Sequence, residues 1–198
     1  MALKTKVKVG QVTNLSEARY CAGMGVDLIG FPIGLQPGQL SLDEVKEISG
    51  WIAGPQLVFE TNPCLDAPTL RQVTLLSPDC LIEVPLEQLT THCIQTVKDH
   101  PLIVSTGYDD WREAAKKREE LNIQYIIIKT HHWNVAWDEI GQLNASIPVL
   151  LQHQETLRID DLLHRPISGL ALTGTAESRP GLKEYSHLAD VLEALESD

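Results

Sequence analysis

The 198-residue sequence has few cysteines, few aromatic residues and no long hydrophobic run. Its four cysteines form no Cys-x-x-Cys pair, so we expect neither a zinc ribbon nor a disulfide framework, but reduced and mostly buried thiols. The longest aliphatic runs, at 126–128 and 149–151, are far shorter than the ~20 apolar residues that a membrane-spanning helix needs. No apolar leader follows the first residues, which predicts a cytoplasmic protein.

Positive charge is also scarce. The chain has 16 Lys and Arg against 27 Asp and Glu, a formal net charge of −11 that disfavours nucleic acid and membrane surfaces as partners. The sequence contains neither Gly-x-Gly-x-x-Gly nor Gly-x-x-x-x-Gly-Lys-Ser/Thr, so the usual nucleotide-binding motifs are missing. Its histidines have no ligand spacing such as His-Glu-x-x-His, and we expect no metal and no cofactor.

What the sequence does contain is a regular alternation of apolar strand-like runs and helical patterns. Asn14 and Ser41 stand where helix N-caps are expected, and Glu44 completes a capping box with Ser41. Eight β/α units predict a single-domain (β/α)8 TIM barrel over residues 1–198, with an open doubly wound sheet as the alternative. The expected strands are 6–9, 26–31, 56–60, 80–84, 102–106, 125–130, 148–151 and 169–173. The expected later helices are 67–76, 86–99, 109–121, 137–143, 158–163 and 182–195.

Several segments, in order, resemble the phosphoribosylanthranilate isomerase family of tryptophan biosynthesis. Residues 8–15, Lys-Val-Gly-Gln-Val-Thr-Asn-Leu, are similar to the family's Lys-Ile-Cys-Gly-Ile-Thr-Asn-Leu. Residues 22–31 are similar to its Ala-Gly-Ala-Asp-Ala-Leu-Gly-Phe segment, and 41–44 to its Ser-Pro-Glu-Glu helix start. Residues 135–137 fall where the family has Phe-Asp-Trp, and 174–184 resemble its Ser-Gly-Val-Glu-Ser-x-Pro-Gly-x-Lys-Asp. The resemblance implies a barrel that rearranges a phosphorylated aminoaldose.

The residues that this chemistry requires are different here. Gly10 stands where the family has its catalytic Cys base, and Lys129 stands where it has its Asp acid. Gly38 matches the Arg that holds the substrate carboxylate in the family. Losing one acid or base lowers rates by ~10²–10⁴, so we expect negligible turnover of phosphoribosylanthranilate and no rescue of a tryptophan auxotroph.

The family's phosphate site is partly replaced. Residues 131–134 and 152–154 put bulky side chains where the resemblance implies glycine-rich loops. Gly174, Thr175 and Ala176 are more similar to the family, and we expect them to precede a short helix whose N–H groups bind an anion.

Other polar residues at the expected strand ends are candidates for replacement chemistry. Lys129 could be a Schiff-base nucleophile or, as we favour, a rim lysine paired with Glu60 or Glu83, in which case Lys129→Met should destabilise the fold. His131 and His153 are the other candidate catalytic residues. The candidate ligand-binding residues are Gln11, Glu60, Thr173, Gly174, Thr175 and Ala176.

The sequence therefore leaves three functions open. The first is a barrel with a remodelled site that binds or acts on a small anionic, phosphorylated molecule. The second is a genuine isomerase with a relocated acid and base, and the third is a non-catalytic relative that binds a ligand or a partner protein. The oligomeric state stays open.

Overall fold

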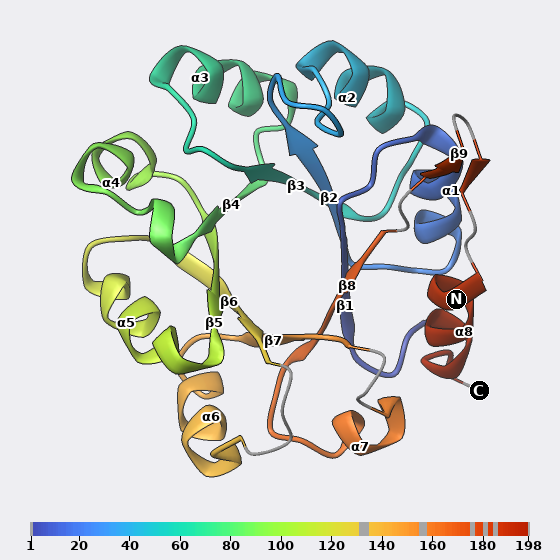
Figure 1. The fold of residues 1–198 in the computed structure, drawn as a ribbon, viewed down its shortest axis with the longest axis vertical. Helices are drawn as coiled ribbons and strands as arrows, with labels where there is room; N and C mark the ends of the chain where they lie inside the picture. The colour runs from blue at the N-terminus through green and yellow to red at the C-terminus, as the bar shows by residue number, and fades with distance from the viewer. Residues whose placement is uncertain are drawn as a thin grey trace.

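The chain forms a closed parallel barrel of eight strands, in the order β1 to β8, with helices around its outside (Figure 1). This confirms the predicted (β/α)8 barrel and excludes the open sheet. The structure is a computed structural model, and it describes residues 2–130, 135–154, 158–174, 177–179, 182–183 and 186–197. The strands are β1 (Lys6–Gly10), β2 (Leu28–Ile33), β3 (Gln56–Thr61), β4 (Leu81–Pro85), β5 (Leu102–Gly107), β6 (Ile123–Lys129), β7 (Val149–Gln152) and β8 (Gly169–Thr173).

The helices that cover the barrel begin at the residues that sequence indicates. The side chain of Asn14 accepts a hydrogen bond from the backbone N–H of Glu17, and Ser41 and Glu44 form the expected capping box. The α-helices are α1 (Leu15–Gly23), α2 (Leu42–Ser49), α3 (Ala67–Leu76), α4 (Thr91–Val97), α5 (Trp111–Lys116), α6 (Trp137–Asn144), α7 (Ile159–Leu163) and α8 (Ser186–Ala194). Short 3₁₀ turns are η1 (Leu86–Gln88), η2 (Tyr108–Asp110) and η3 (Lys117–Glu119).

The interior of the barrel has an apolar layer of seven buried side chains, separate from the larger core between strands and helices. These side chains are Leu28, Val58, Leu81, Ile103, Ile127, Leu150 and Ala171. Residues two positions further along a strand point to the same face, so this layer fixes which side chains enter the upper barrel. Those residues are Gly30, Glu60, Glu83, Ser105, Lys129, Gln152 and Thr173.

Two predicted helical stretches are wrong in part. The helix expected at 182–195 begins only at Ser186, because Leu182–Lys183 forms the short strand β10. The short helix expected after Gly174 is also wrong, since Glu177–Arg179 is strand β9 and pairs antiparallel with β10. An anion-binding helix N-terminus therefore does not follow Gly174 in the described part of the chain.

The helix expected over 86–99 is divided. Thr90 accepts a hydrogen bond from the backbone N–H of Cys93 and caps a new helix, α4, after the turn η1. A side chain that bonds to the backbone three residues on starts a helix rather than continuing one, which explains the break.

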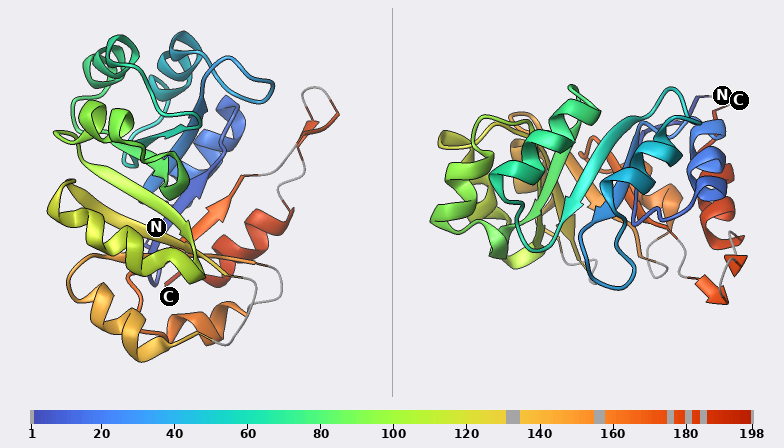
Figure 2. Two further views of the ribbon diagram at one scale, coloured as in Figure 1. Left: turned by 60° about the vertical axis from the view of Figure 1, so that its left-hand side comes forward. Right: turned by 90° about the horizontal axis from the view of Figure 1, so that it is seen from above.

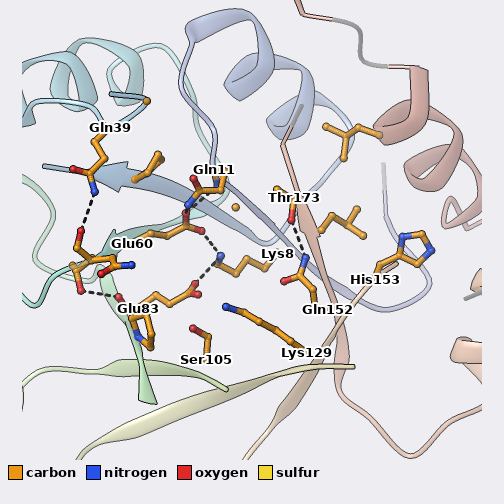
Figure 3. A pocket seen from close by; sticks show the side chains of 18 of the residues that line it. Lys8, Gln11, Gln39, Glu60, Glu83, Ser105, Lys129, Gln152, His153 and Thr173 are labelled. Carbon is orange, nitrogen blue, oxygen red and sulfur yellow. Dashed lines mark hydrogen bonds and ion pairs between the residues drawn. The ribbon is translucent and has the colours of Figure 1, made fainter. Parts of the chain in front are cut away.

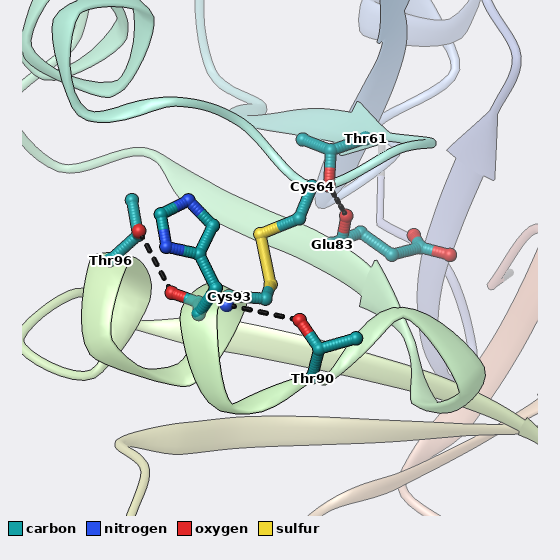
Figure 4. The surroundings of a disulfide bond; sticks show 7 residues. Thr61, Cys64, Glu83, Thr90, Cys93 and Thr96 are labelled. Atoms are coloured by element: carbon teal, nitrogen blue, oxygen red, sulfur yellow. Dashed lines mark hydrogen bonds between the residues drawn. A yellow bond between two sulfur atoms is a disulfide. The ribbon is translucent and has the colours of Figure 1, made fainter.

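Cys64 and Cys93 form a disulfide, so the expectation of four reduced thiols is wrong (Figure 4). The bond joins the segment after β3 to α4, and the two Cα atoms lie 5.9 Å apart. The other two cysteines, Cys21 and Cys80, are free and buried, as expected. The sequence could not indicate the pairing because 29 positions separate the two residues and only the barrel brings the β3 and β4 connections together.

The two ends of the chain meet at the amino-terminal side of the barrel, as predicted (Figure 2). The backbone N–H of Lys4 donates to the carbonyl of Leu195, and that of Ser197 donates to the carbonyl of Ala2. Among the described residues, no helix is long and apolar enough to cross a membrane.

Candidate functional site

The carboxyl ends of the strands surround a cavity of about 1030 Å³. This is the end at which TIM-barrel enzymes carry their active sites. The lining is rich in amides and contains the side chains of four charged residues, Lys8, Glu60, Glu83 and Lys129. Further polar lining residues are Gln11, Gln36, Gln39, Thr61, Asn62, Ser105, Gln152, His153, Gln154 and Thr173.

The floor of the cavity is an ion triad built from β1, β3 and β4 (Figure 3). The Lys8 ammonium contacts Glu60 Oε1 in a short ion pair and lies 2.8 Å from Glu83 Oε2. Lys8 is 3% exposed and Glu60 is 8% exposed, so both charges are almost removed from water. A buried charge needs such partners, because desolvation without a counter-ion is unfavourable by several kcal/mol.

Two opposing effects act on the ammonium of Lys8. Burial alone would lower its pKa, because desolvation disfavours the charged form. The charges of Glu60 and Glu83 outweigh burial and raise the pKa above its usual value. Lys8 is therefore a permanent cation at neutral pH and cannot act as a nucleophile.

Gln11 completes the environment of Glu60. Its backbone N–H donates to Glu60 Oε2 at 2.9 Å, and its side-chain amide donates to the same oxygen at 2.5 Å. Gln11 has a φ of 57°, in the left-handed region that residues other than glycine rarely occupy. With Lys8 on the other oxygen, three donors bind the Glu60 carboxylate, which makes it a structural group rather than a free base.

Glu60 occupies space that two glycines leave open. A Cβ on Gly10 would lie 2.3 Å from Glu60 Oε1 and 2.7 Å from Lys8 Nζ. A Cβ on Gly30 would lie 2.2 Å from the same carboxylate oxygen. The position at which the resemblance implies a cysteine side chain is therefore filled by the Lys8–Glu60 ion pair.

Lys129 does not have the carboxylate partner that we favoured on sequence. It forms no ion pair or hydrogen bond with a described residue, and Figure 3 shows its amino group directed into the pocket toward Ser105 and Glu83. The prediction is wrong because Lys8, which points into the barrel two positions before Gly10, already binds both candidate carboxylates. Lys129 also lies on a more exposed part of the rim.

The other predicted site residues are brought together only in part. Gln11, Glu60, His153 and Thr173 line the cavity, whereas Gly174 is not among its lining residues. Thr173 accepts a hydrogen bond from the Gln152 amide at 2.9 Å. Figure 3 shows His153 on the side of the pocket away from Glu60 and Glu83. His131, Thr175 and Ala176 lie outside the described residues.

Sequence reasoning missed Lys8 as a site residue. A signal was available, because Lys8 stands between Val7 and Val9 in the first strand, and those two side chains face the helix layer. In a barrel strand the residue between them must enter the interior, where a lysine needs carboxylates from neighbouring strands. In the described part of the chain, no group of three or more His, Cys, Asp or Glu side chains could hold a metal ion.

Fold and site together define a (β/α)8 barrel with a polar pocket at the carboxyl ends of its strands. No family model and no curated protein matches the chain. Among solved structures, it is similar to phosphoribosylanthranilate isomerase from Thermotoga maritima, at 17% identity and a TM-score of 0.69, over 96% of this chain and 100% of that one.

Two further structures carry phosphorylated ligands. One is a phosphoribosylanthranilate isomerase in complex with reduced 1-(o-carboxyphenylamino)-1-deoxyribulose 5-phosphate, at 17% identity and a TM-score of 0.70, over 96% of this chain and 97% of that one. The other is KGPDC from Streptococcus mutans in complex with a D-pentose 5-phosphate, at 14% identity and a TM-score of 0.64, over 98% and 100%. The chain thus has the fold of phosphoribosylanthranilate isomerases and of a related barrel enzyme.

Proposed function

We propose that this chain is a remodelled relative of phosphoribosylanthranilate isomerase that binds a small anionic, phosphorylated molecule in the pocket and does not catalyse the standard rearrangement. The observation that carries the proposal is Lys129, a cation directed into the pocket and without a carboxylate partner among the described residues. The two carboxylates of the lining are already bound by Lys8.

Charge balance supports an anionic ligand. The whole chain has a formal charge of −11, but the charged lining consists of two lysines and two glutamates, so the pocket is locally neutral. In a strongly acidic protein, a neutral pocket with one unpaired ammonium is a favourable place for an anion. The ligands in two similar barrels, named above, carry a phosphate group.

The loss of isomerase activity rests on the arrangement around Gly10. No side chain projects there, and the nearest carboxylate, Glu60, has both oxygens bound by donors. A carboxylate that accepts three hydrogen bonds is a poor proton acceptor. Restoring the cysteine by Gly10→Cys alone should not restore activity, because the new Cβ would overlap the Lys8–Glu60 pair.

Calorimetric titration tests the proposed ligand class. The probes are inorganic phosphate, D-ribulose 5-phosphate and the reduced 1-(o-carboxyphenylamino)-1-deoxyribulose 5-phosphate named above. We expect the phosphorylated sugars to bind, and Lys129→Met to weaken them roughly 10–100-fold, the worth of one charge-assisted hydrogen bond. Lys116→Met is the matched control, because it removes an exposed lysine on α5, outside the barrel. The proposal fails if no probe binds at millimolar concentration or if Lys129→Met binds as tightly as the wild type.

Turnover of phosphoribosylanthranilate separates this proposal from the isomerase alternative. We expect negligible turnover by the purified protein and no growth of a tryptophan auxotroph that expresses it. Robust complementation would favour an isomerase with a relocated acid and base, for which Glu83 is the first candidate because one of its oxygens is not bound to Lys8.

A further inference from the structure

Three uncommitted polar groups gather on one side of the pocket, at the ends of β4, β5 and β6. Lys129 is the last residue of β6 and follows the interior residue Ile127 by two positions, so it faces into the barrel. The strand registers place Pro85 beside Ser105 and Gly107 beside Lys129. Figure 3 shows the Lys129 amino group directed toward Ser105 and Glu83.

The Ser105 hydroxyl has no hydrogen-bond partner in the described part of the chain, although the residue is only 1% exposed. Buried hydroxyls are nearly always satisfied, and one that lines a cavity without a partner indicates a polar group of a ligand. Glu83 contributes a second open position, because Lys8 binds Oε2 and no described residue donates a hydrogen bond to Oε1. An amine, a hydroxyl and a carboxylate oxygen are thus available together.

This set differs from the rest of the polar lining, where the groups are mostly bound to one another. Gln11 is bound to Glu60, Gln152 to Thr173, and Gln39 to the carbonyl of Asn62 at 3.1 Å. The reactive part of a ligand would therefore find its free partners on the Lys129 side of the pocket.

We propose that Lys129 forms an imine with an aldehyde or ketone group of the ligand, held by Ser105 and Glu83. This inference rests on the proposed function, and it names a carbonyl compound as the substrate class. Lys129 suits the role better than Lys8 because an amine locked between two buried carboxylates cannot lose the proton that blocks attack.

Atoms and protons balance in this step. Glu83 Oε1 accepts one proton from the Lys129 ammonium, and the neutral amine adds to the carbonyl carbon while Ser105 donates a hydrogen bond to the carbonyl oxygen. The C–N bond forms, and the oxygen takes a proton to give a carbinolamine. A second proton from nitrogen and the proton returned by Glu83 allow this oxygen to leave as water, so ammonium and carbonyl become a protonated imine and one water.

Reductive trapping tests the proposal. The full-length protein is incubated with glycolaldehyde phosphate and sodium cyanoborohydride, which converts an imine to a stable secondary amine, and the labelled lysines are mapped by peptide mass spectrometry. We expect Lys129 to be labelled at least tenfold faster than the exposed lysines Lys98 and Lys116, and inorganic phosphate to slow the labelling of Lys129 alone. Equal labelling of all three lysines would overturn the proposal.

Two variants separate this inference from the proposed function. Lys129→Arg keeps a cation but cannot form a neutral amine, so it should retain phosphate binding within about threefold and lose the specific adduct. Ser105→Ala should slow labelling of Lys129 at least fivefold, without changing phosphate affinity by more than threefold. If phosphate binds the wild type and Lys129→Arg but no selective adduct forms, the imine is refuted and the anion-binding proposal stands.

The reverse outcome is equally informative. If unphosphorylated glycolaldehyde labels Lys129 as selectively as its phosphate does, and phosphate itself does not bind, the imine stands and the anionic ligand class is refuted. If neither binding nor selective labelling is observed, both proposals are refuted.

Discussion

Replacing Lys8 with methionine should be among the most destabilising single changes in this protein. The substitution keeps the length of the side chain but leaves Glu60, which is 8% exposed, and Glu83 facing each other without a cation. Breaking a buried ion pair from one side is unfavourable by about 3–5 kcal/mol, because it leaves a desolvated charge uncompensated. For a barrel of this size, that loss lowers the melting temperature by roughly 6–20 °C.

The assay is equilibrium unfolding in guanidinium chloride, followed by tryptophan fluorescence. Lys129→Met is the matched control, because it makes the same change at the same end of the barrel without breaking an ion pair with a described residue, and it should alter the unfolding free energy by less than about 1 kcal/mol. The earlier expectation that Lys129→Met destabilises the fold is thereby transferred to Lys8. A Lys8→Met variant within about 1 kcal/mol of the wild type would refute the reasoning.

Two further measurements identify the cause of the loss. Neutralising both acids, by Glu60→Gln and Glu83→Gln in the Lys8→Met background, should recover most of the stability because no buried charge is left uncompensated. The deficit of Lys8→Met should also be smaller at pH 5 than at pH 8, because protonation relieves the unpaired carboxylates. A deficit that is unchanged by neutralisation and by pH would indicate lost packing instead.

The other predictions concern pH, the interior glycines and the cysteines. Because the pKa of Lys8 is raised, the stability from its ion pairs is fully present below the ordinary lysine pKa and is lost only as pH rises through the raised value, so denaturant titrations should show no loss from Lys8 between pH 6 and pH 9. Gly30→Ala should lower the unfolding free energy by about 1–3 kcal/mol, since its Cβ would lie 2.2 Å from Glu60 Oε1; a thermal melt identical to the wild type would contradict this. Cys64→Ser should lower the unfolding free energy by roughly 3–4 kcal/mol through loss of the cross-link to Cys93, and in the native wild type no thiol should react with iodoacetamide, because burial raises the pKa of Cys80 to about 11 and shields Cys21. Alkylation of Cys64 before reduction would show that the disulfide is absent.

The architecture was largely predictable from local sequence. Runs such as 102–106 are apolar throughout because strands in a parallel barrel are covered on both faces, and this composition depends on the neighbours along the chain alone. Caps such as Ser41 with Glu44 act within one helical turn, which is why the expected start of α2 was correct. The prediction failed at Leu182–Lys183, where pairing with β9 overrides a helical pattern.

The chemistry of the pocket was predictable only as an inventory. The sequence by itself determined that lysines, glutamates and glutamines lie at strand ends, and that Gly10 carries no side chain. Which lysine binds which carboxylate was decided by the tertiary structure, because Lys8 and Glu60 are 52 positions apart and meet only when the barrel closes. The same holds for Cys64 and Cys93. The physical reason is that strand alternation is a local property, whereas the partners of an inward-facing charge are set by the register of separate strands, which the barrel as a whole imposes.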